Sequence, residues 1–300
     1  MIRNLVIATM IASAAANAFA ADALQVFAGI PPVAYLVERV GGDRVRVDAL
    51  IQPGQDPHTF EPGPKEIQGL AQAGFFFKVG IPFEDQVLEK IRAVHPHMTV
   101  VDTTDGIAKR HYSPESSAQG ILSHRDNAHG ESPEALDPHV WLSPPLIKKM
   151  AANIADALAK GYPADAAYFQ NNRAQLDRDL DNLDAKIRNQ LKPYEGRAFF
   201  VFHPAFGYFA DCYHLKQQAV EAAAKPPSPR QLRELVEKAR ADHIRVVFVE
   251  PQFDPHSAQA VADAIGGKIA TLNDLDKDVL ANLRDIADKI QESFGESNAR

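Results

Sequence analysis

Short apolar runs alternate with amphipathic stretches along the first part of the chain. The apolar runs have the length of buried strands, and they cover residues 24–28, 45–51, 75–79 and 99–102. Between them, apolar side chains recur at helical spacing over residues 32–40, 64–73 and 83–94. Alternation of strands and helices predicts a parallel sheet with helices on both of its faces.

A second series of the same kind begins near residue 197. Its predicted strands are residues 198–202, 216–220, 245–250 and 268–272. Helices fit between them over residues 228–241 and 255–265. The sequence therefore predicts an α/β protein with two (β/α) lobes, each built on a mainly parallel, four-stranded sheet.

The region between the two series has the pattern of two helices. Residues 145–160 form the first, which ends at Gly161-Tyr162-Pro163, and residues 164–191 form the second, which ends at Lys192-Pro193. At the helical rise, the second helix would be roughly 40 Å long, which is enough to bridge two domains. We expect a first lobe over residues 21–160, a long rigid backbone helix over 161–193 and a second lobe over 194–300.

The N-terminus has the pattern of an export signal. Arg3 gives it a positive start, residues 5–16 are apolar, and Ala18-Phe19-Ala20 forms a small-x-small cleavage site. The apolar run is too short to span a bilayer permanently. We expect residues 1–20 to be a signal peptide whose removal leaves the mature chain free in a bacterial periplasm; the alternative is an N-terminal core helix. No cysteine follows the cleavage site, so a lipid anchor is not expected.

Composition and net charge limit which molecules the protein is expected to bind. The chain has 300 residues, 45% of them hydrophobic, which is typical of a soluble globular protein. Its formal net charge of −7 argues against nucleic acid or an anionic membrane as the partner. A single cysteine, Cys212, excludes an internal disulfide and is expected to pack as a small hydrophobe. Nothing indicates an obligate oligomer, so a monomer is expected.

Three histidines stand beside prolines at the ends of extended segments. His58 and His139 close the tripeptides Asp56-Pro57-His58 and Asp137-Pro138-His139, and His203-Pro204 follows a predicted strand. A lone histidine is more often a surface or core residue than a ligand. Three in matching settings favour one shared metal site. Imidazole suits zinc, copper, nickel and iron, whereas manganese prefers oxygen donors, so the site favours zinc.

Zinc usually takes a fourth ligand, which should come from the second lobe. Ligands bind at the carboxyl ends of parallel strands, and the last predicted strand is followed by Asn273-Asp274-Leu275-Asp276. Asp274 and Asp276 are candidates, although both could instead cap the next helix. Glu250 ends a neighbouring strand; it lies near the metal, orients a ligand histidine, or has a helix-entry or interlobe role. Glu61 is a supporting or surface group.

Residues 110–136 differ from the rest of the chain. The stretch is rich in Ser, Glu, Asp, Gly and Pro and contains His111, His124 and His129. A loop of this length within a compact domain is usually functional or disordered. A solvated loop and a loop that collects metal at low affinity are the two alternatives.

Four extended motifs together resemble a known family. They are Asp56-Pro57-His58-Thr59-Phe60-Glu61-Pro62, Asp137-Pro138-His139-Val140-Trp141-Leu142-Ser143-Pro144, Phe202-His203-Pro204-Ala205-Phe206-Gly207-Tyr208-Phe209 and Glu250-Pro251-Gln252-Phe253. Their order along the mature chain is similar to that of the metal-binding solute-binding proteins of ABC importers, the ZnuA-like zinc group. The resemblance implies two lobes with one metal ion in the cleft between them. It also implies that the protein is not an enzyme and that it delivers metal to a membrane permease powered by a cytoplasmic ATPase.

The resemblance also assigns roles to residues. It implies that His58 and His139 come from the first lobe and His203 from the second, a position where manganese-preferring members tend to carry a carboxylate. It implies a His- and acid-rich loop between the first two ligands, where residues 110–136 stand. The family's fourth ligand is usually an Asp, but Asn273 stands at that place, and a neutral amide is a poor zinc ligand. Asp274, a water molecule and a three-coordinate site are the options, and we lean to Asp274.

Two other functions compete with the zinc importer. The first is a manganese- or iron-binding protein of the same fold. The second is an exported zinc hydrolase, against which the sequence offers neither a His-Glu-x-x-His helix nor an obvious general base.

Overall fold

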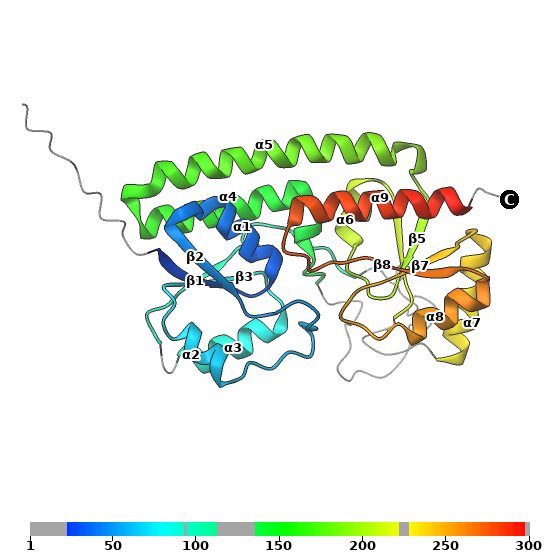
Figure 1. Cartoon of the computed structure of the whole chain (residues 1–300), viewed down its shortest axis with the longest axis horizontal. Coiled ribbons are helices and arrows are strands. Elements are labelled where there is room, and N and C mark those ends of the chain that lie inside the picture. Colours follow the sequence, from blue (N-terminus) through cyan, green and yellow to red (C-terminus); the bar gives the residue numbers. More distant parts are fainter. Residues whose placement is uncertain (1–22, 93–94, 113–135, 222–227, 298–300) are drawn as a thin grey trace, which may run out of the picture.

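Two all-parallel, four-stranded sheets form the two halves of the molecule (Figure 1). The computed structural model describes residues 23–92, 95–112, 136–221 and 228–297. The expected signal peptide, residues 1–20, lies outside these residues. No helix in the described ranges combines the length and apolarity needed to cross a bilayer.

The first sheet has the strand order β2-β1-β3-β4. Its strands are β1 (Leu24–Ala28), β2 (Val45–Ala49), β3 (Phe75–Lys78) and β4 (Thr99–Asp102). The helices of this lobe are α1 (Pro31–Gly41), α2 (Pro64–Leu70) and α3 (Pro82–Arg92). All three begin at a proline, whose fixed φ and missing N–H suit the first helical position. The four predicted strands are confirmed, and their ends shift by two residues at most.

The second sheet repeats this topology with the order β6-β5-β7-β8. Its strands are β5 (Ala198–Val201), β6 (Lys216–Ala219), β7 (Val246–Val249) and β8 (Lys268–Thr271). Its helices are α6 (Gly207–Cys212), α7 (Pro229–Ala241) and α8 (His256–Ile265). The sequence analysis missed α6, because six residues are too few for a helical period to stand out.

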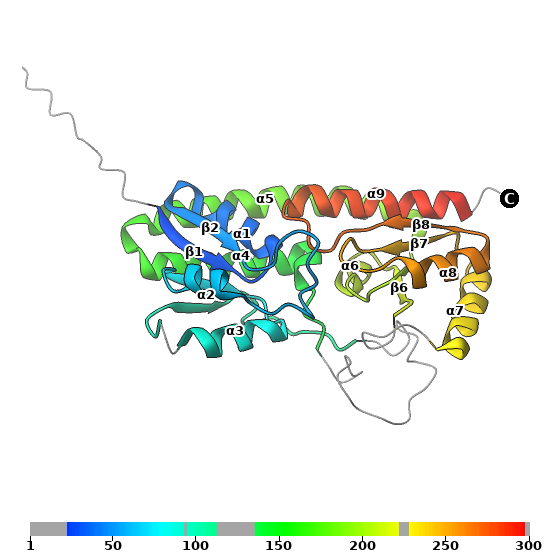
Figure 2. The same cartoon turned by 60° about the horizontal axis from the view of Figure 1, so that its bottom comes forward.

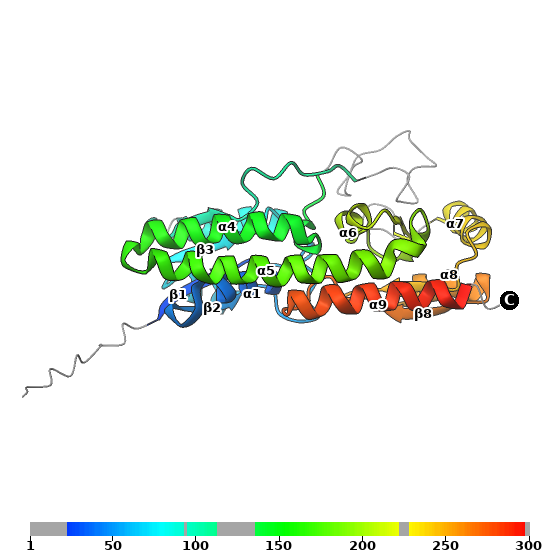
Figure 3. The same ribbon diagram turned by 90° about the horizontal axis from the view of Figure 1, so that it is seen from above.

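Three long helices cover both sheets on one side (Figures 1 and 3). They are α4 (Pro144–Gly161), α5 (Ala166–Leu191) and α9 (Val279–Ser297). The helix α5 packs against α1 and α4 in the first lobe and against α9 in the second. The predicted long helix joining the lobes is therefore confirmed. The helices α2 and α3, and α7 and α8, lie on the opposite side of their sheets (Figure 2).

The sequence analysis allowed for a helix after Asp276 but gave no bounds for α9. Its buried residues Leu283, Ile286, Ile290 and Phe294 recur every three or four positions, which is a helical pattern. The same spacing is present in the sequence.

One hydrophobic core continues from the first sheet into the second. It includes Phe76 of β3, Leu180 of α5 and Phe199 of β5, all almost fully buried. A separate cluster covers the other face of the second sheet and includes Phe200 of β5, because successive strand residues point to opposite faces. The shared core resists separation of the lobes, since opening it would expose apolar surface to water. The division at residues 160 and 193 stays a prediction.

Candidate metal centre

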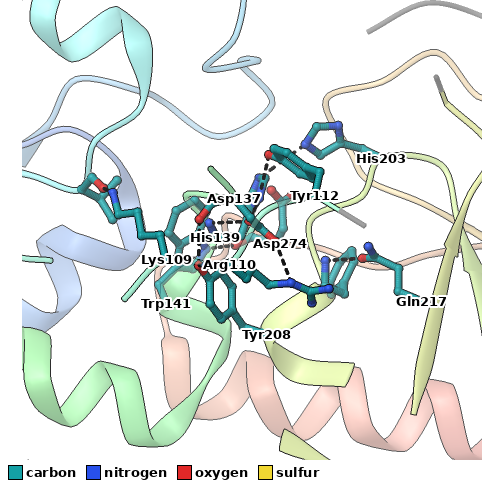
Figure 4. Close-up of polar contacts among 12 residues, drawn as sticks. Lys109, Arg110, Tyr112, Asp137, His139, Trp141, His203, Tyr208, Gln217 and Asp274 are labelled. Carbon is teal, nitrogen blue, oxygen red and sulfur yellow. Dashed lines mark hydrogen bonds and ion pairs between the residues drawn. The ribbon is translucent and has the colours of Figure 1, made fainter. Parts of the chain in front are cut away.

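Three histidines from distant parts of the chain meet between the lobes. One ring nitrogen from each of His58, His139 and His203 lies within 4.8 Å of those of the other two. The Nε2 atoms of His139 and His203 are 3.4 Å apart (Figure 4). Among the described residues, this is the group of His, Cys, Asp and Glu side chains whose geometry could hold a metal ion.

The spacing of the two buried rings suits a tetrahedral ion. Zinc–imidazole bonds are about 2.0–2.1 Å long, so two ligands of a tetrahedral zinc lie about 3.3 Å apart. The Nε2 atoms of His139 and His203 are separated by nearly that distance. The side chains of His139 and His203 are buried, whereas His58 is exposed.

A carboxylate fixes the ring of His139. The side chain of Asp137 accepts the backbone N–H of His139 at 3.0 Å and the ring Nδ1–H at 2.8 Å, which leaves Nε2 for a metal. The hydroxyl of Tyr112 lies 3.5 Å from the same Nδ1. Burial raises the pKa of the Asp137 carboxyl to about 7, and the His139 backbone N–H and Arg110 oppose that rise. The Trp141 ring packs 5.1 Å from the imidazole, centroid to centroid.

A second carboxylate fixes the ring of His203. The Nδ1 of His203 lies 2.9 Å from Oε2 of Glu221, and Phe253 packs against the ring with centroids 5.1 Å apart. Glu250 accepts the backbone N–H of His203 at 3.2 and 3.3 Å, so it supports the chain at His203 and not the ring. Burial raises the pKa of Glu250 well above its usual value; the charge of His203 opposes the rise and that of Asp274 adds to it.

The carboxyl ends of the second sheet explain this cluster. Each strand is followed within three residues by a buried polar side chain: His203 after β5, Glu221 after β6, Glu250 after β7 and Asp274 after β8. Parallel strands bring these positions to one edge of the sheet. Sequence analysis missed Glu221, although its place directly after a predicted strand was a usable signal.

The turn at His58 repeats that at His139. Oδ1 of Asp56 accepts the backbone N–H of His58 at 2.9 Å, as Asp137 does for His139. A third tripeptide, Asp254-Pro255-His256, makes the same turn, with Asp254 accepting the backbone N–H at 3.1 Å. The side chain of His256 is nevertheless 90% exposed. The tripeptide therefore sets a local turn, and only its place in the fold decides whether the histidine reaches the site.

The other predicted site residues lie around this centre. Asp274 is buried, but its carboxylate accepts a hydrogen bond from Gln252 at 2.9 Å and lies outside the three-histidine group. The side chain of Asn273 accepts the backbone N–H of Leu275 at 3.0 Å. Asp276 is exposed and accepts the backbone N–H of Asp278 just before α9. Glu61 is exposed in the loop after β2.

The loop 110–136 is described only at its two ends. His111 is exposed and forms an isolated antiparallel bridge with Leu136. His124 and His129 lie outside the described residues, so metal collection by this loop stays a prediction.

Comparisons with known proteins decide the family. The family model for the zinc-uptake complex component A, periplasmic (ZnuA), matches residues 26–293. The chain belongs to the ZnuA family. The resemblance to this family is thereby confirmed.

Members of the ZnuA family are similar to this chain over most of its length. The high-affinity zinc uptake system protein ZnuA of Bacillus subtilis (strain 168) is 30% identical over 258 residues, which cover 85% of this chain and 79% of the relative. A crystal structure of ZnuA superposes with a TM-score of 0.81 at 33% identity and covers 91% of this chain and 99% of the other. A ZnuA deletion mutant with zinc bound superposes with the same TM-score at 34% identity over 91% and 98% of the two chains.

Proposed function

We propose that this chain is a periplasmic zinc-binding protein that captures Zn²⁺ between its lobes and delivers it to an ABC-type import permease. Zn²⁺ is the transported ligand. One observation carries the proposal: three imidazoles converge between the lobes, and two of their Nε2 atoms stand at the spacing of a tetrahedral zinc site.

The chemistry of the donors favours zinc over manganese. All three members of the group are nitrogen donors, whereas manganese prefers carboxylate and carbonyl oxygens. The carboxylates of Asp137 and Glu221 accept hydrogen bonds from the Nδ1 atoms of the two buried histidines. This arrangement orients histidine ligands and raises their basicity. The names of the relatives, zinc uptake and zinc-bound ZnuA, support the same ion.

We further propose that His58, His139 and His203 are the protein ligands and that water takes the fourth position. Asp274, which the sequence analysis favoured, is held by Gln252 and would have to leave that contact to bind the ion. A three-histidine zinc with an open position is also the geometry of a hydrolase. The buried rings and the shared core of the lobes favour a binding protein, and the family's uptake proteins support that choice.

The proposal also includes the periplasmic location of the protein and its permease partner. The signal-like pattern of residues 1–20 and the periplasmic description of the family support a periplasmic protein released from its signal. The permease partner follows from the role of the family's uptake complex, and a monomer remains the expected state.

The test is a calorimetric titration of the metal-free mature protein with Zn²⁺ and, separately, with Mn²⁺. We expect one tight zinc site per chain and weak manganese binding. Tighter manganese binding would favour the alternative of a manganese-binding protein of the same fold. The absence of a stoichiometric site would overturn the proposal. Hydrolysis of an ester or peptide panel that disappears in His58→Ala would instead favour the hydrolase.

A further inference from the structure

A cluster of three residues joins the His139 segment to the second lobe, and we name it the Arg110–Asp137–Tyr208 clamp. The hydroxyl of Tyr208, on α6, donates to the backbone carbonyl of Asp137 at 2.9 Å. The same hydroxyl accepts the backbone N–H of Arg110 at 2.8 Å. The backbone N–H of Asp137 donates to the carbonyl of Arg110 at 2.8 Å, which closes the cluster (Figure 4).

Charge reinforces the clamp on both sides. The guanidinium of Arg110 lies 4.0 Å from Oδ2 of Asp137 and 3.1 Å from Oδ2 of Asp211, which also stands on α6. It lies over the Tyr208 ring, 5.8 Å from its centroid. A single cation thus connects the carboxylate that holds His139 to the helix that follows His203.

The residues around Gly207 are closely packed. A Cβ atom added to Gly207 would lie 2.2 Å from Nη1 of Arg110 and 3.0 Å from Oδ2 of Asp137. Tyr208 is only 6% exposed and Asp137 only 1%. A side chain at position 207 would therefore displace the Arg110 guanidinium from its place beside Asp137.

A second contact holds the other side of His139. The indole N–H of Trp141 donates to the backbone carbonyl of Asp274, in the second lobe, at 2.7 Å. His139 is thus flanked on both sides by hydrogen bonds to the second lobe. The side chain of His58, in contrast, is exposed.

We infer that Tyr208 and Arg110 are positioning residues that act through Asp137. They hold His139 beside His203 before the ion arrives, so that these two rings form a preset pair and His58 completes the site. The inference rests on the proposed function, but it concerns residues outside the ligand set.

The experiment compares Tyr208→Phe with Tyr213→Phe. Both changes remove a buried hydroxyl near α6, but that of Tyr213 lies beside Asp184 on α5 and outside the clamp. Zinc affinity is measured by chelator competition in the wild-type, His58→Ala and His139→Ala backgrounds. Thermal unfolding of each metal-free variant controls for folding, and Arg110→Lys is the second variant should Tyr208→Phe fail to fold.

We expect Tyr208→Phe to weaken zinc binding roughly tenfold, at the lower end of the effects of residues that orient ligands. The same factor should appear in the His58→Ala background and vanish in His139→Ala, because the clamp acts through His139. Tyr213→Phe should change the affinity by less than about twofold. An unchanged affinity in Tyr208→Phe, or an equal loss in both histidine backgrounds, would overturn the inference.

A metal-free measurement separates this inference from the proposed function. In the imidazole ¹H–¹⁵N spectrum of the metal-free protein, assigned with the alanine variants, Tyr208→Phe should shift the His139 signals and leave those of His58 in place. If the wild type bound no zinc, the proposed function would fail while this spectrum still tested the clamp. Unshifted His139 signals would refute it.

Discussion

The Nδ1 atom of His203 lies 2.9 Å from a carboxylate oxygen of Glu221, although eighteen positions separate the two residues. They follow the neighbouring strands β5 and β6, whose parallel pairing brings their carboxyl ends together. Both side chains are buried, at 4% and 6% exposure. Glu221 therefore fixes which nitrogen of His203 faces the other two rings.

Replacing Glu221 should weaken the site. We expect Glu221→Gln to reduce zinc affinity by roughly 10- to 100-fold. The amide oxygen of glutamine is an uncharged acceptor, so it holds the Nδ1–H of His203 less strongly than the carboxylate does. Chelator competition measures the effect, and Glu61→Gln, at an exposed position in the His58 loop, is the matched control. Equal affinities in Glu221→Gln and the wild type would show that this contact does not matter for the ion.

Asp274 allows a test of the fourth ligand. With water in that position, Asp274→Ala should change zinc affinity by less than about 100-fold, the upper range for residues that do not touch the metal. A larger loss, seen by calorimetry, would make Asp274 a ligand, as the sequence analysis favoured. Asp276→Ala is the control, because Asp276 is exposed in the same turn.

The third histidine should set the choice of metal. His203→Glu replaces a nitrogen donor by an oxygen donor, so we expect the ratio of manganese to zinc affinity to rise. Parallel titrations with the two ions measure this ratio. A ratio equal to that of the wild type would count against His203 as a direct ligand. The exposed His256→Glu makes the same substitution in an Asp-Pro-His turn outside the site.

Trp141 should report on metal occupancy. It is the only tryptophan in the sequence, and its ring centroid lies 5.1 Å from that of His139. We expect its fluorescence to change on zinc addition and to saturate at one equivalent. The change should be lost in His139→Ala at the same zinc concentration, whereas the Tyr213→Phe protein should respond as the wild type does. A zinc-insensitive emission in a protein that binds zinc would contradict this placement.

Glu84 should make the stability of the metal-free protein depend on pH. Its carboxylate is fully buried and accepts backbone N–H groups from Val79, Gly80 and Ile81. Burial raises its pKa from 4.5 to about 7, although those hydrogen bonds oppose the rise. The folded state therefore binds this proton more tightly than the unfolded state, and stability falls as pH rises from about 4.5 to about 7.

The size of that loss is on the order of 3 kcal/mol for one group. We expect the free energy of unfolding, measured with denaturant across this range, to fall less steeply in Glu84→Gln than in the wild type. Glu89→Gln, at an exposed position of α3, should keep the wild-type slope. Identical slopes in the wild type and Glu84→Gln would show that Glu84 does not titrate in this range.

The elements of the fold could be predicted because their signals are local. Several strands, such as β3, β5 and β7, are short apolar runs, and β3 is followed by the helical pattern of α3. The ends moved by one or two residues because a sheet continues only as long as its neighbour pairs with it. The short helix α6 has too few residues for a helical period to stand out in the sequence.

The sequence by itself determined the two α/β halves, the long helix between them and the Asp-Pro-His turns. Those turns form locally, because the Asp carboxylate accepts the backbone N–H of the His two residues later. The proline between them has no backbone N–H that could compete for the carboxylate. The sequence indicated that His58, His139 and His203 share a site, but only the tertiary structure separated them from His256, which has the same local turn and faces solvent. It also decided that Glu221 holds the His203 ring, since strand pairing and lobe packing depend on contacts between residues far apart in the chain.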